Sequence, residues 1–338
     1  MISSSISAFF IGVSTAFFTI FAIHILCFRP NRTRFQTVLG YTMCVWAILN
    51  LKDLILTFPE MYTPSILNWV MIIDGWSAIS YTVLLLETVM PQWFTWKRIL
   101  YFSIPFCIFT AAYALVSCEA IIYAYAVFLW IYAWTIVIFG YSKVRKHIKY
   151  VHENYSNIEN IDVSWLRPVF AFVITTQILW LITSLYGEFW LDILYYISCL
   201  ASWLMVLRYS WNFQPIQTNA PTQSNPIPKQ FPFADKLEKV MKEKKLYLRP
   251  DLTLDDLAQE IGTNRLYASN YLNQAKGITF YDYINQLRIT EVSIPLMKEH
   301  SEYTLEHIAI QSGFKSISTF RRAFVKLTGE NPSNYNKT

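Results

Sequence analysis

Four ionisable side chains, Lys52, Asp53, Asp74 and Glu87, stand inside long apolar stretches of the sequence. A charge in an apolar medium is costly, so such groups are either paired or functional. Lys52 and Asp74 fall on successive stretches, and antiparallel neighbours would bring them together, whereas Asp53 and Glu87 have no evident partner. Two interpretations stay open. The groups form a buried structural ion pair with neighbours that snorkel toward water, or they sense a ligand or a proton.

Motifs for catalysis and for metal binding are missing from the sequence. It contains no H-E-x-x-H, no G-x-S-x-G and no G-x-x-x-x-G-K-[ST]. The five cysteines are scattered and never spaced C-x-x-C, which argues against a disulfide framework and a structural zinc site. A b-type haem needs two axial histidines, and only His24 lies in an apolar stretch. We therefore predict that the chain is not an enzyme and has no catalytic residues, no metal and no cofactor.

The elements that would hold the four charges are long apolar helices. Of the 338 residues, 54% are hydrophobic and 15% are charged, against roughly 25% charged residues in a typical soluble domain. The stretches are apolar around their whole circumference, which argues against a soluble helical core. We predict a seven-span transmembrane sensor domain over residues 1–211. Its spans cover about 6–28, 36–58, 66–90, 99–117, 120–141, 169–186 and 189–207, and the division between the fourth and the fifth rests only on Ser117–Glu119.

The loops between the predicted spans differ in charge. Lys and Arg follow the first, third and fifth spans, whereas the alternate loops contain acidic residues and no Lys or Arg. The positive-inside rule then places the N-terminus outside and the residues after the seventh span in the cytoplasm. We expect a multi-pass protein of the inner, cytoplasmic membrane.

The composition changes after the seventh span. Residues 1–212 contain 12 Lys and Arg and 10 Asp and Glu, whereas the shorter stretch 213–338 contains 16 and 13. Residues 212–231 are rich in Pro, Gln and Asn and have too little apolar content to pack, so they read as a linker.

Residues 232–338 are predicted to be all-helical, with a helix, a short turn and a second helix occurring twice, at about 253–274 and 304–327. Thr253, Asn264, Thr304 and Ser316 are placed to cap helix starts, and Gly262 and Gly313 are placed to end helices. A long helix from about Thr279 to Lys298 connects the two copies. A doubled helix-turn-helix at this spacing is much more specific than a single one.

The residues of both copies resemble a known family. Leu254–Leu272, LDDLAQEIGTNRLYASNYL, and Ile308–Tyr335, IAIQSGFKSISTFRRAFVKLTGENPSNY, are similar to the two halves of the AraC/XylS-type DNA-binding domain, and Tyr283–Ile289 resembles its linker helix. With the spans added, the chain resembles the membrane-embedded AraC-type regulators of Bacteroidetes-like bacteria. The expected fold is all-α, a seven-helix transmembrane bundle followed by a cytoplasmic double helix-turn-helix domain.

The resemblance implies that each lobe lays its second helix in the major groove of DNA. Residues expected to face DNA are Arg265, Leu266, Ser269 and Asn270 on the first such helix and Ser318, Thr319, Arg321 and Arg322 on the second. Ala268, Tyr271, Leu272, Phe320 and Phe324 are expected to pack inward. The alternative for Arg321 and Arg322 is an ordinary solvated face. Pro295 departs from the family pattern and is expected to disturb the connecting helix.

These predictions together describe a one-component transcription regulator of a bacterial membrane, in which a transmembrane sensor controls sequence-specific DNA binding. Its expected partners are double-stranded DNA, the lipid bilayer, a second copy in a homodimer, and an unidentified small-molecule or membrane-protein signal. The alternative is a membrane receptor-like protein whose helical C-terminal domain binds a protein partner. A membrane enzyme is disfavoured because Asp53, Asp74 and Glu87 do not assemble a catalytic cluster.

Overall fold

The computed structural model describes residues 2–61, 63–186, 189–216 and 231–335, and this part of the chain is helical. Its extended pairing is limited, among these residues, to an isolated antiparallel bridge between Tyr155 and Thr253. The chain divides into two compact units. Unit 1 comprises Met1–Arg145 and Val163–Thr218, and unit 2 comprises Lys146–Asp162 and Asn219–Thr338. Residues 146–162, which the sequence assigns to the transmembrane domain, therefore pack with the C-terminal domain.

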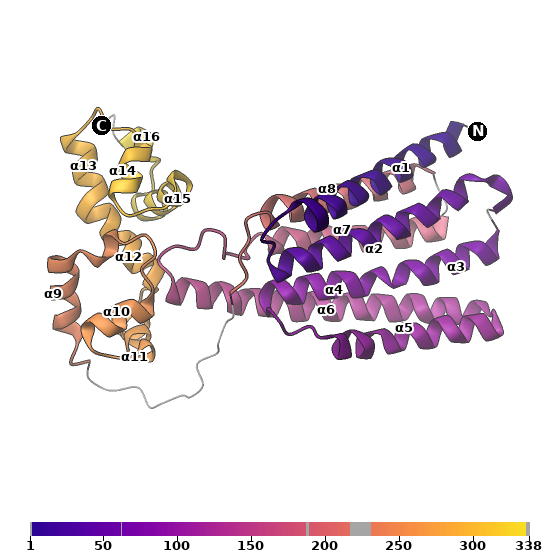
Figure 1. Cartoon of the computed structure of the whole chain (residues 1–338), viewed down its shortest axis with the longest axis horizontal. Coiled ribbons are helices and arrows are strands. Elements are labelled where there is room, and N and C mark those ends of the chain that lie inside the picture. The colour runs from indigo at the N-terminus through magenta and orange to yellow at the C-terminus, as the bar shows by residue number, and fades with distance from the viewer. Residues whose placement is uncertain (1, 62, 187–188, 217–230, 336–338) are drawn as a thin grey trace. The chain divides into compact units, whose positions relative to one another are not determined.

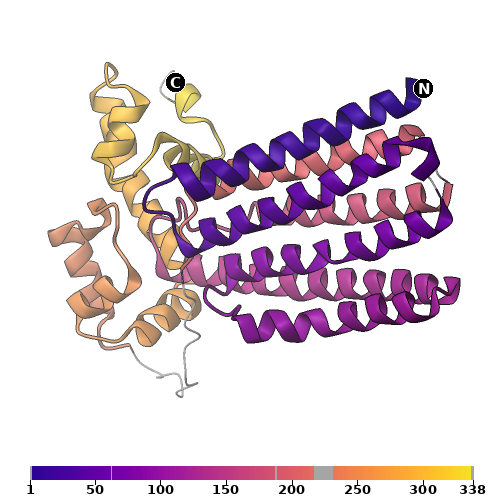
Figure 2. The same ribbon diagram turned by 45° about the vertical axis from the view of Figure 1, so that its right-hand side comes forward.

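Unit 1 is a bundle of helices that lie side by side (Figure 1 and Figure 2). Its α-helices are α1 (Ile2–Ile23), α2 (Arg34–Asp53), α3 (Pro64–Gly75), α4 (Ser77–Val89), α5 (Trp96–Val116), α6 (Glu119–Asn154), α7 (Leu166–Tyr186) and α8 (Phe189–Ser210). A π-helical turn (His24–Phe28) extends α1, and 3-10 turns (Leu54–Thr57 and Pro59–Met61) follow α2. Six of the described helical stretches are long and apolar enough to cross a membrane, and Leu166–Trp180 is a shorter apolar helix.

The third predicted span is divided into α3 and α4 at Trp76. The Tyr125 hydroxyl donates a hydrogen bond to the Ile72 carbonyl at 3.0 Å, the group that would accept from the Trp76 N–H in an unbroken helix. The Trp76 N–H bonds to the Ile73 carbonyl instead. A Cβ at Gly75 would overlap the Tyr125 hydroxyl, so the glycine makes this approach possible. The break thus comes from a side chain inserted into the helical ladder.

The boundary between α5 and α6 lies where the sequence places it, but α6 is much longer than the fifth predicted span. Helix α5 ends at Val116, Ser117 is left-handed with φ 48°, and α6 begins at Glu119. Helix α6 then continues to Asn154, whereas the predicted span ends at residue 141. Its last turns, from Lys146, belong to unit 2.

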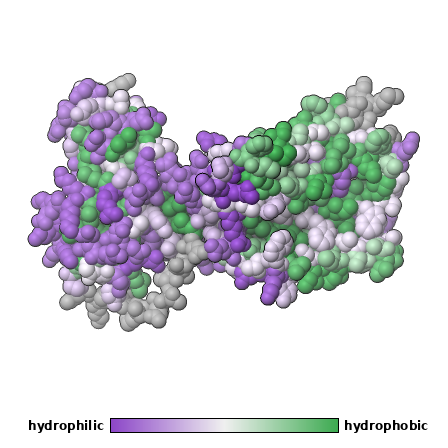
Figure 3. Space-filling view, in the orientation of Figure 1, coloured by the Kyte–Doolittle hydropathy of each residue, from purple (hydrophilic) through white to green (hydrophobic). Residues whose placement is uncertain are grey.

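Aromatic side chains fill the interior of unit 1, and apolar side chains cover its outside. Phe18, Trp46, Tyr81 and Trp203 form one cluster of ring contacts, and Phe106 and Tyr125 are fully buried in another. Large apolar side chains are exposed along α1, α2, α5, α6 and α8. Figure 3 shows hydrophobic residues gathered over this unit, whereas the visible surface of unit 2 is mostly hydrophilic.

Unit 2 contains two helical lobes, each with its own core. Its remaining helices are α9 (Ala234–Lys244), α10 (Leu254–Ile261), α11 (Arg265–Asn270), α12 (Phe280–Arg288), α13 (Ile294–Glu299), α14 (Leu305–Gln311), α15 (Ile317–Thr328) and α16 (Pro332–Tyr335). Leu254, Leu257 and Ile284 are fully buried in the first core, and Ile308 and Phe320 in the second. Residues 217–230, most of the predicted linker, lie outside the described residues.

Pro295 does disturb the connecting helix, and the disturbance is a π-turn. Helices α12 and α13 are joined by π-helical residues Ile289–Ser293, directly before the proline. Pro295 has no N–H for the carbonyl of Glu291, and its ring crowds that carbonyl. The wider π-turn relieves this contact without ending the helix.

Candidate functional site

Three of the charges in the apolar stretches form one cluster at the end of α2. Lys52 Nζ lies 2.7 Å from Asp74 Oδ1 and also contacts Asp53 Oδ1. The Tyr196 hydroxyl donates to Asp53 Oδ2 at 3.4 Å. Asp53, which the sequence leaves without a partner, thus shares Lys52 with Asp74. The cluster contains one more carboxylate than cation, and its side chains are between 14% and 28% exposed.

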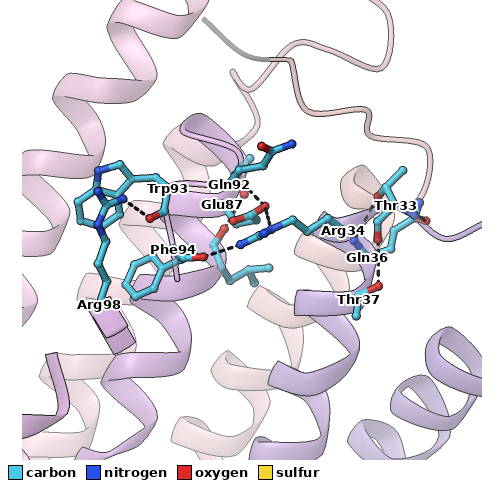
Figure 4. Close-up of polar contacts among 11 residues, drawn as sticks. Thr33, Arg34, Gln36, Thr37, Glu87, Gln92, Trp93, Phe94 and Arg98 are labelled. Carbon is cyan, nitrogen blue, oxygen red and sulfur yellow. Dashed lines mark hydrogen bonds and ion pairs between the residues drawn. The ribbon is translucent and has the colours of Figure 1, made fainter. Parts of the chain in front are cut away.

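Glu87 also has a partner that the sequence does not reveal. Its carboxylate is 1% exposed and lies 2.8 Å from Arg34 Nε, and the Gln92 N–H donates to the same oxygen at 3.2 Å (Figure 4). Arg34 also donates to the Phe94 carbonyl, so it ties the start of α2 to the end of α4 and the loop that follows. Arg34 lies 53 positions before Glu87, which is why sequence proximity does not show the pair. This geometry suits a structural role.

The first helix-turn-helix of unit 2 consists of α10, a glycine turn and α11. Thr253 and Asp256 form a reciprocal capping box: Thr253 Oγ1 accepts from the Asp256 N–H at 3.2 Å, and the Asp256 carboxylate accepts from the Thr253 N–H at 2.9 Å. Gly262, with φ 76°, ends α10. Asn264 Oδ1 then accepts from the Tyr267 N–H at 2.9 Å and starts α11. Caps and turn lie at the positions that the sequence predicts.

Helix α11 has a core face and a partly covered outer face. Ala268 of α11 is buried, and in the turn that follows the helix Leu272 is buried and Tyr271 packs against the same core. The four residues expected to face DNA are each half-buried: Arg265, Leu266, Ser269 and Asn270. The helix is also shorter than predicted, because a π-turn replaces its regular geometry from Tyr271 to Ala275.

The second helix-turn-helix presents an open basic face on α15. Ser318, Arg321 and Arg322 are exposed on it, as expected. Thr319, expected to face DNA, is 2% exposed, so that expectation is wrong. Thr319 precedes the buried Ala323 by four residues and therefore lies on the same helix face, turned to the core. Its backbone N–H donates to Ser316 Oγ at 3.3 Å as part of the helix cap.

A buried arginine organises the junction of the lobes; it lies in the segment that resembles the linker helix, but the sequence gives it no role of its own. Arg288, at the end of α12, is 1% exposed, and Nε donates to the Tyr247 carbonyl at 2.6 Å and Nη2 to the Arg249 carbonyl at 2.8 Å. Burial lowers the pKa of Arg288 to about 10. Its guanidinium also lies over the Phe314 ring, at 5.3 Å from the centroid, and so touches the second lobe. The one sequence signal is a cation in an otherwise core-forming run.

Comparisons with known proteins concern this C-terminal part. A family profile described as "Helix-turn-helix domain" matches residues 257–338. An uncharacterized HTH-type transcriptional regulator of Staphylococcus aureus (strain COL) is 29% identical over 101 residues, which are 30% of this chain and 13% of that protein. The TCP pilus virulence regulatory protein of Vibrio cholerae is 39% identical over 80 residues, which are 24% of this chain and 28% of that protein.

The chain thus spans less than a third of the length of either relative. No solved structure matches it significantly. These matches place an AraC-type helix-turn-helix domain at the C-terminus of this chain, in agreement with the resemblance of the sequence.

Proposed function

We propose that the protein is a membrane-embedded, one-component transcription regulator whose C-terminal domain binds double-stranded DNA. The observation that carries the proposal is the pair of capped helix-turn-helix units, joined by one connecting helix, in a segment that matches a helix-turn-helix family. Such units bind with the second helix of each pair in the major groove.

On this proposal the two lobes contribute different residues. Ser318, Arg321 and Arg322 of α15 contact DNA directly, because their side chains are already exposed on one face. An arginine at these positions reads guanine through two hydrogen bonds or binds a phosphate group. The serine hydroxyl can bind a base edge or a phosphate group. On α11 the contacts come from Arg265, Leu266, Ser269 and Asn270.

Several features of unit 1 support embedding in a membrane. Its outer surface carries large exposed apolar side chains such as Leu100, Ile108 and Ile131, which a soluble protein of this size would bury. Its basic loops alternate with acidic ones, which favours an outside N-terminus and a cytoplasmic C-terminus. DNA lies on that side of a bacterial inner membrane.

A cavity inside unit 1 supports a lipophilic signal. It is walled by α4, α6, α7 and α8, and its lining is mostly apolar, with Phe170 and Trp203 among it. A hydroxyl pair is also present, since Thr82 Oγ1 and Tyr132 Oη lie 2.8 Å apart. An apolar cavity with few polar groups suits a small apolar ligand that carries one polar function.

Genome-wide occupancy of the full-length protein in its host tests the proposal, with the Arg321→Ala/Arg322→Ala double variant as control. Discrete peaks that disappear in the variant support a membrane-tethered regulator. If the wild-type protein inserts and expresses well but occupies no site, and a partner protein is retained by unit 2, the domain binds protein instead of DNA.

A further inference from the structure

Residues 146–162 dock on the first lobe of the DNA-binding domain through backbone contacts. Ser156 is fully buried; its N–H donates to the Leu252 carbonyl at 3.2 Å, and its hydroxyl donates to the same oxygen at 2.7 Å. Tyr155 pairs with Thr253 in the antiparallel bridge. Thr253 is the cap of α10, so the segment binds at the start of the first helix-turn-helix.

The same segment completes the surroundings of the buried Arg288. Arg288 Nη1 donates to the Ser156 carbonyl at 3.3 Å, and Nη2 lies 3.4 Å from Ser156 Oγ. The acceptors around this cation are carbonyl, hydroxyl and amide oxygens. A buried cation that loses a hydrogen-bond acceptor is left with part of its charge uncompensated, which is energetically costly. Ser156 supplies two of these acceptors, and this marks the docking as a specific interaction and not as a chance contact of two surfaces.

The segment also covers the first residue of the helix that would read DNA. The Arg265 guanidinium lies over the Tyr150 ring at 5.7 Å from its centroid, and Nη1 is 3.3 Å from the Tyr150 hydroxyl. The same guanidinium lies 3.9 Å from Asp255 Oδ2 of α10, and the Arg265 side chain is 28% exposed. By contrast, Arg321 and Arg322 in the second lobe are exposed. One lobe is thus open, and the other is partly occupied by the chain itself.

We propose that residues 146–162 and DNA compete for the first lobe, so that the docked segment keeps the domain in a weakly binding state. This rests on the proposed DNA binding. Tyr150 is in direct contact with the guanidinium of Arg265, so a duplex contacted by Arg265 would occupy the space of the α6 end. Undocking frees Arg265 and lets both lobes engage the same duplex.

The position of the segment in the chain suggests how undocking is controlled. Residues 146–162 begin in the last turns of α6 and end shortly before α7. The apolar cavity of unit 1 is lined by Val137 of α6, by Trp165 directly before α7 and by Leu166 at its start. A ligand in that cavity contacts the chain on both sides of the segment, and a shift of either helix changes how the segment reaches the first lobe.

A disulfide lock tests the competition. Tyr155→Cys/Thr253→Cys joins the two bridge residues, since directly opposed residues of an antiparallel pair lie about 4.5–5.5 Å apart at Cα, which a disulfide can span. The full-length protein in lipid nanodiscs first selects ligands from random-sequence duplexes under reducing conditions, and their affinity is then measured with and without oxidation. The Thr253→Cys single variant, treated alike, controls for the altered cap and for the native cysteines.

We expect the oxidised double variant to bind the selected duplexes about tenfold more weakly than its reduced form, because one arginine contact contributes about this factor to the affinity. Reductant should restore binding. Equal binding in both forms, with the disulfide verified by mass spectrometry, overturns the proposal. Failure of the disulfide to form contradicts the docking itself. If no duplex is enriched even under reducing conditions, the proposed DNA binding fails, which is a separate outcome.

A release variant gives the opposite result. Tyr150→Ala/Tyr155→Ala removes two side chains of the segment and no residue of the DNA-binding helices, and we expect it to tighten binding of the full-length protein by about tenfold on the same ground. Lys149→Ala is the matched control, because Lys149 is exposed on the same helix and its Nζ pairs with Glu153 at 3.8 Å. Unchanged or weaker binding by the double variant overturns the competition.

Discussion

Gly313, in the turn between α14 and α15, lies directly against the backbone of Leu248. A Cβ on Gly313 would stand 2.7 Å from the Leu248 carbonyl oxygen, and the glycine has φ 84°. The turn of the second helix-turn-helix therefore rests on the peptide that follows α9 in the first lobe. Two recognition helices that enter successive major grooves must keep a separation of about 34 Å, and this contact helps to hold the lobes in a fixed relation.

Gly313→Ala should strongly destabilise the C-terminal domain. The substitution adds backbone overlap to the strain of a left-handed residue, and strain alone costs about 1 kcal/mol. Gly277→Ala is the matched control, because Gly277 also has positive φ, at 66°, but a Cβ there meets nothing within 4 Å. The full-length protein is heated, and the unfolding of unit 2 is monitored by limited proteolysis. The loss of stability should be clearly larger for Gly313→Ala than for Gly277→Ala. Equal losses would mean that the Leu248 backbone yields easily.

Removing the arginines of α15 should lower the affinity for DNA and make that affinity less dependent on salt concentration. Arg321→Ala and Arg322→Ala each remove an exposed cation from the proposed groove face, and the slope of log affinity against log salt should fall by about 1 for each phosphate that is no longer bound. An arginine that instead reads a base should cost about 1–3 kcal/mol when removed and relax sequence preference. Fluorescence anisotropy over a salt series measures both. Lys242→Ala, exposed on α9, should leave binding nearly unchanged; an equal effect would point to general charge attraction.

The ion pair between Arg34 and Glu87 should stabilise unit 1 because Arg34 neutralises the buried charge of Glu87. Arg34→Ala leaves a carboxylate that is 1% exposed without its cation. Because the Arg34 side chain is itself 51% exposed, the loss of stability should fall below the roughly 3–5 kcal/mol of a fully buried pair. Arg34→Ala/Glu87→Gln should recover much of that stability, because the buried group is then neutral. Thermal unfolding in lipid nanodiscs measures both variants. A double variant no more stable than the single one would show that Arg34 acts through its bond to the Phe94 carbonyl instead.

Local sequence rules predict the helix-turn-helix units well. The capping residues Thr253, Asn264, Thr304 and Ser316 and the left-handed Gly262 and Gly313 act within a few positions of themselves. Short-range hydrogen bonds and backbone sterics decide such features, so the sequence suffices. The expectation for Thr319, which came from the family resemblance, fails because the helical period aligns this residue with the buried Ala323.

Features that depend on distant parts of the chain are not predictable in this way. The break at Trp76 needs Tyr125, Glu87 needs Arg34, and Arg288 needs Ser156 from a segment that precedes it by 132 positions. The end of α6 at Asn154 is equally hidden, because the apolar pattern of the fifth predicted span stops at residue 141. Residues 146–154 pack within unit 2, which a local pattern does not record.

Acidification should strengthen DNA binding of the full-length protein through His152. This residue lies in the docked segment, and its ring centroid is 4.9 Å from that of Tyr281. Burial lowers the pKa of His152, and the positive charge of Lys326 lowers it further. The carboxylates of Asp162 and Asp282 raise this pKa, but burial outweighs them. An undocked His152 has an ordinary pKa of about 6.5. Docking is therefore fully favourable above this value, and it weakens as the pH falls through it, because the free segment binds the proton more readily. Fluorescence anisotropy titrations at fixed ionic strength, between about pH 7.5 and 5.5, bracket an ordinary histidine pKa. As the pH falls over this range, the DNA affinity of the wild-type protein should rise relative to that of His152→Gln. Parallel curves for the two proteins would exclude His152 as a contributor to docking.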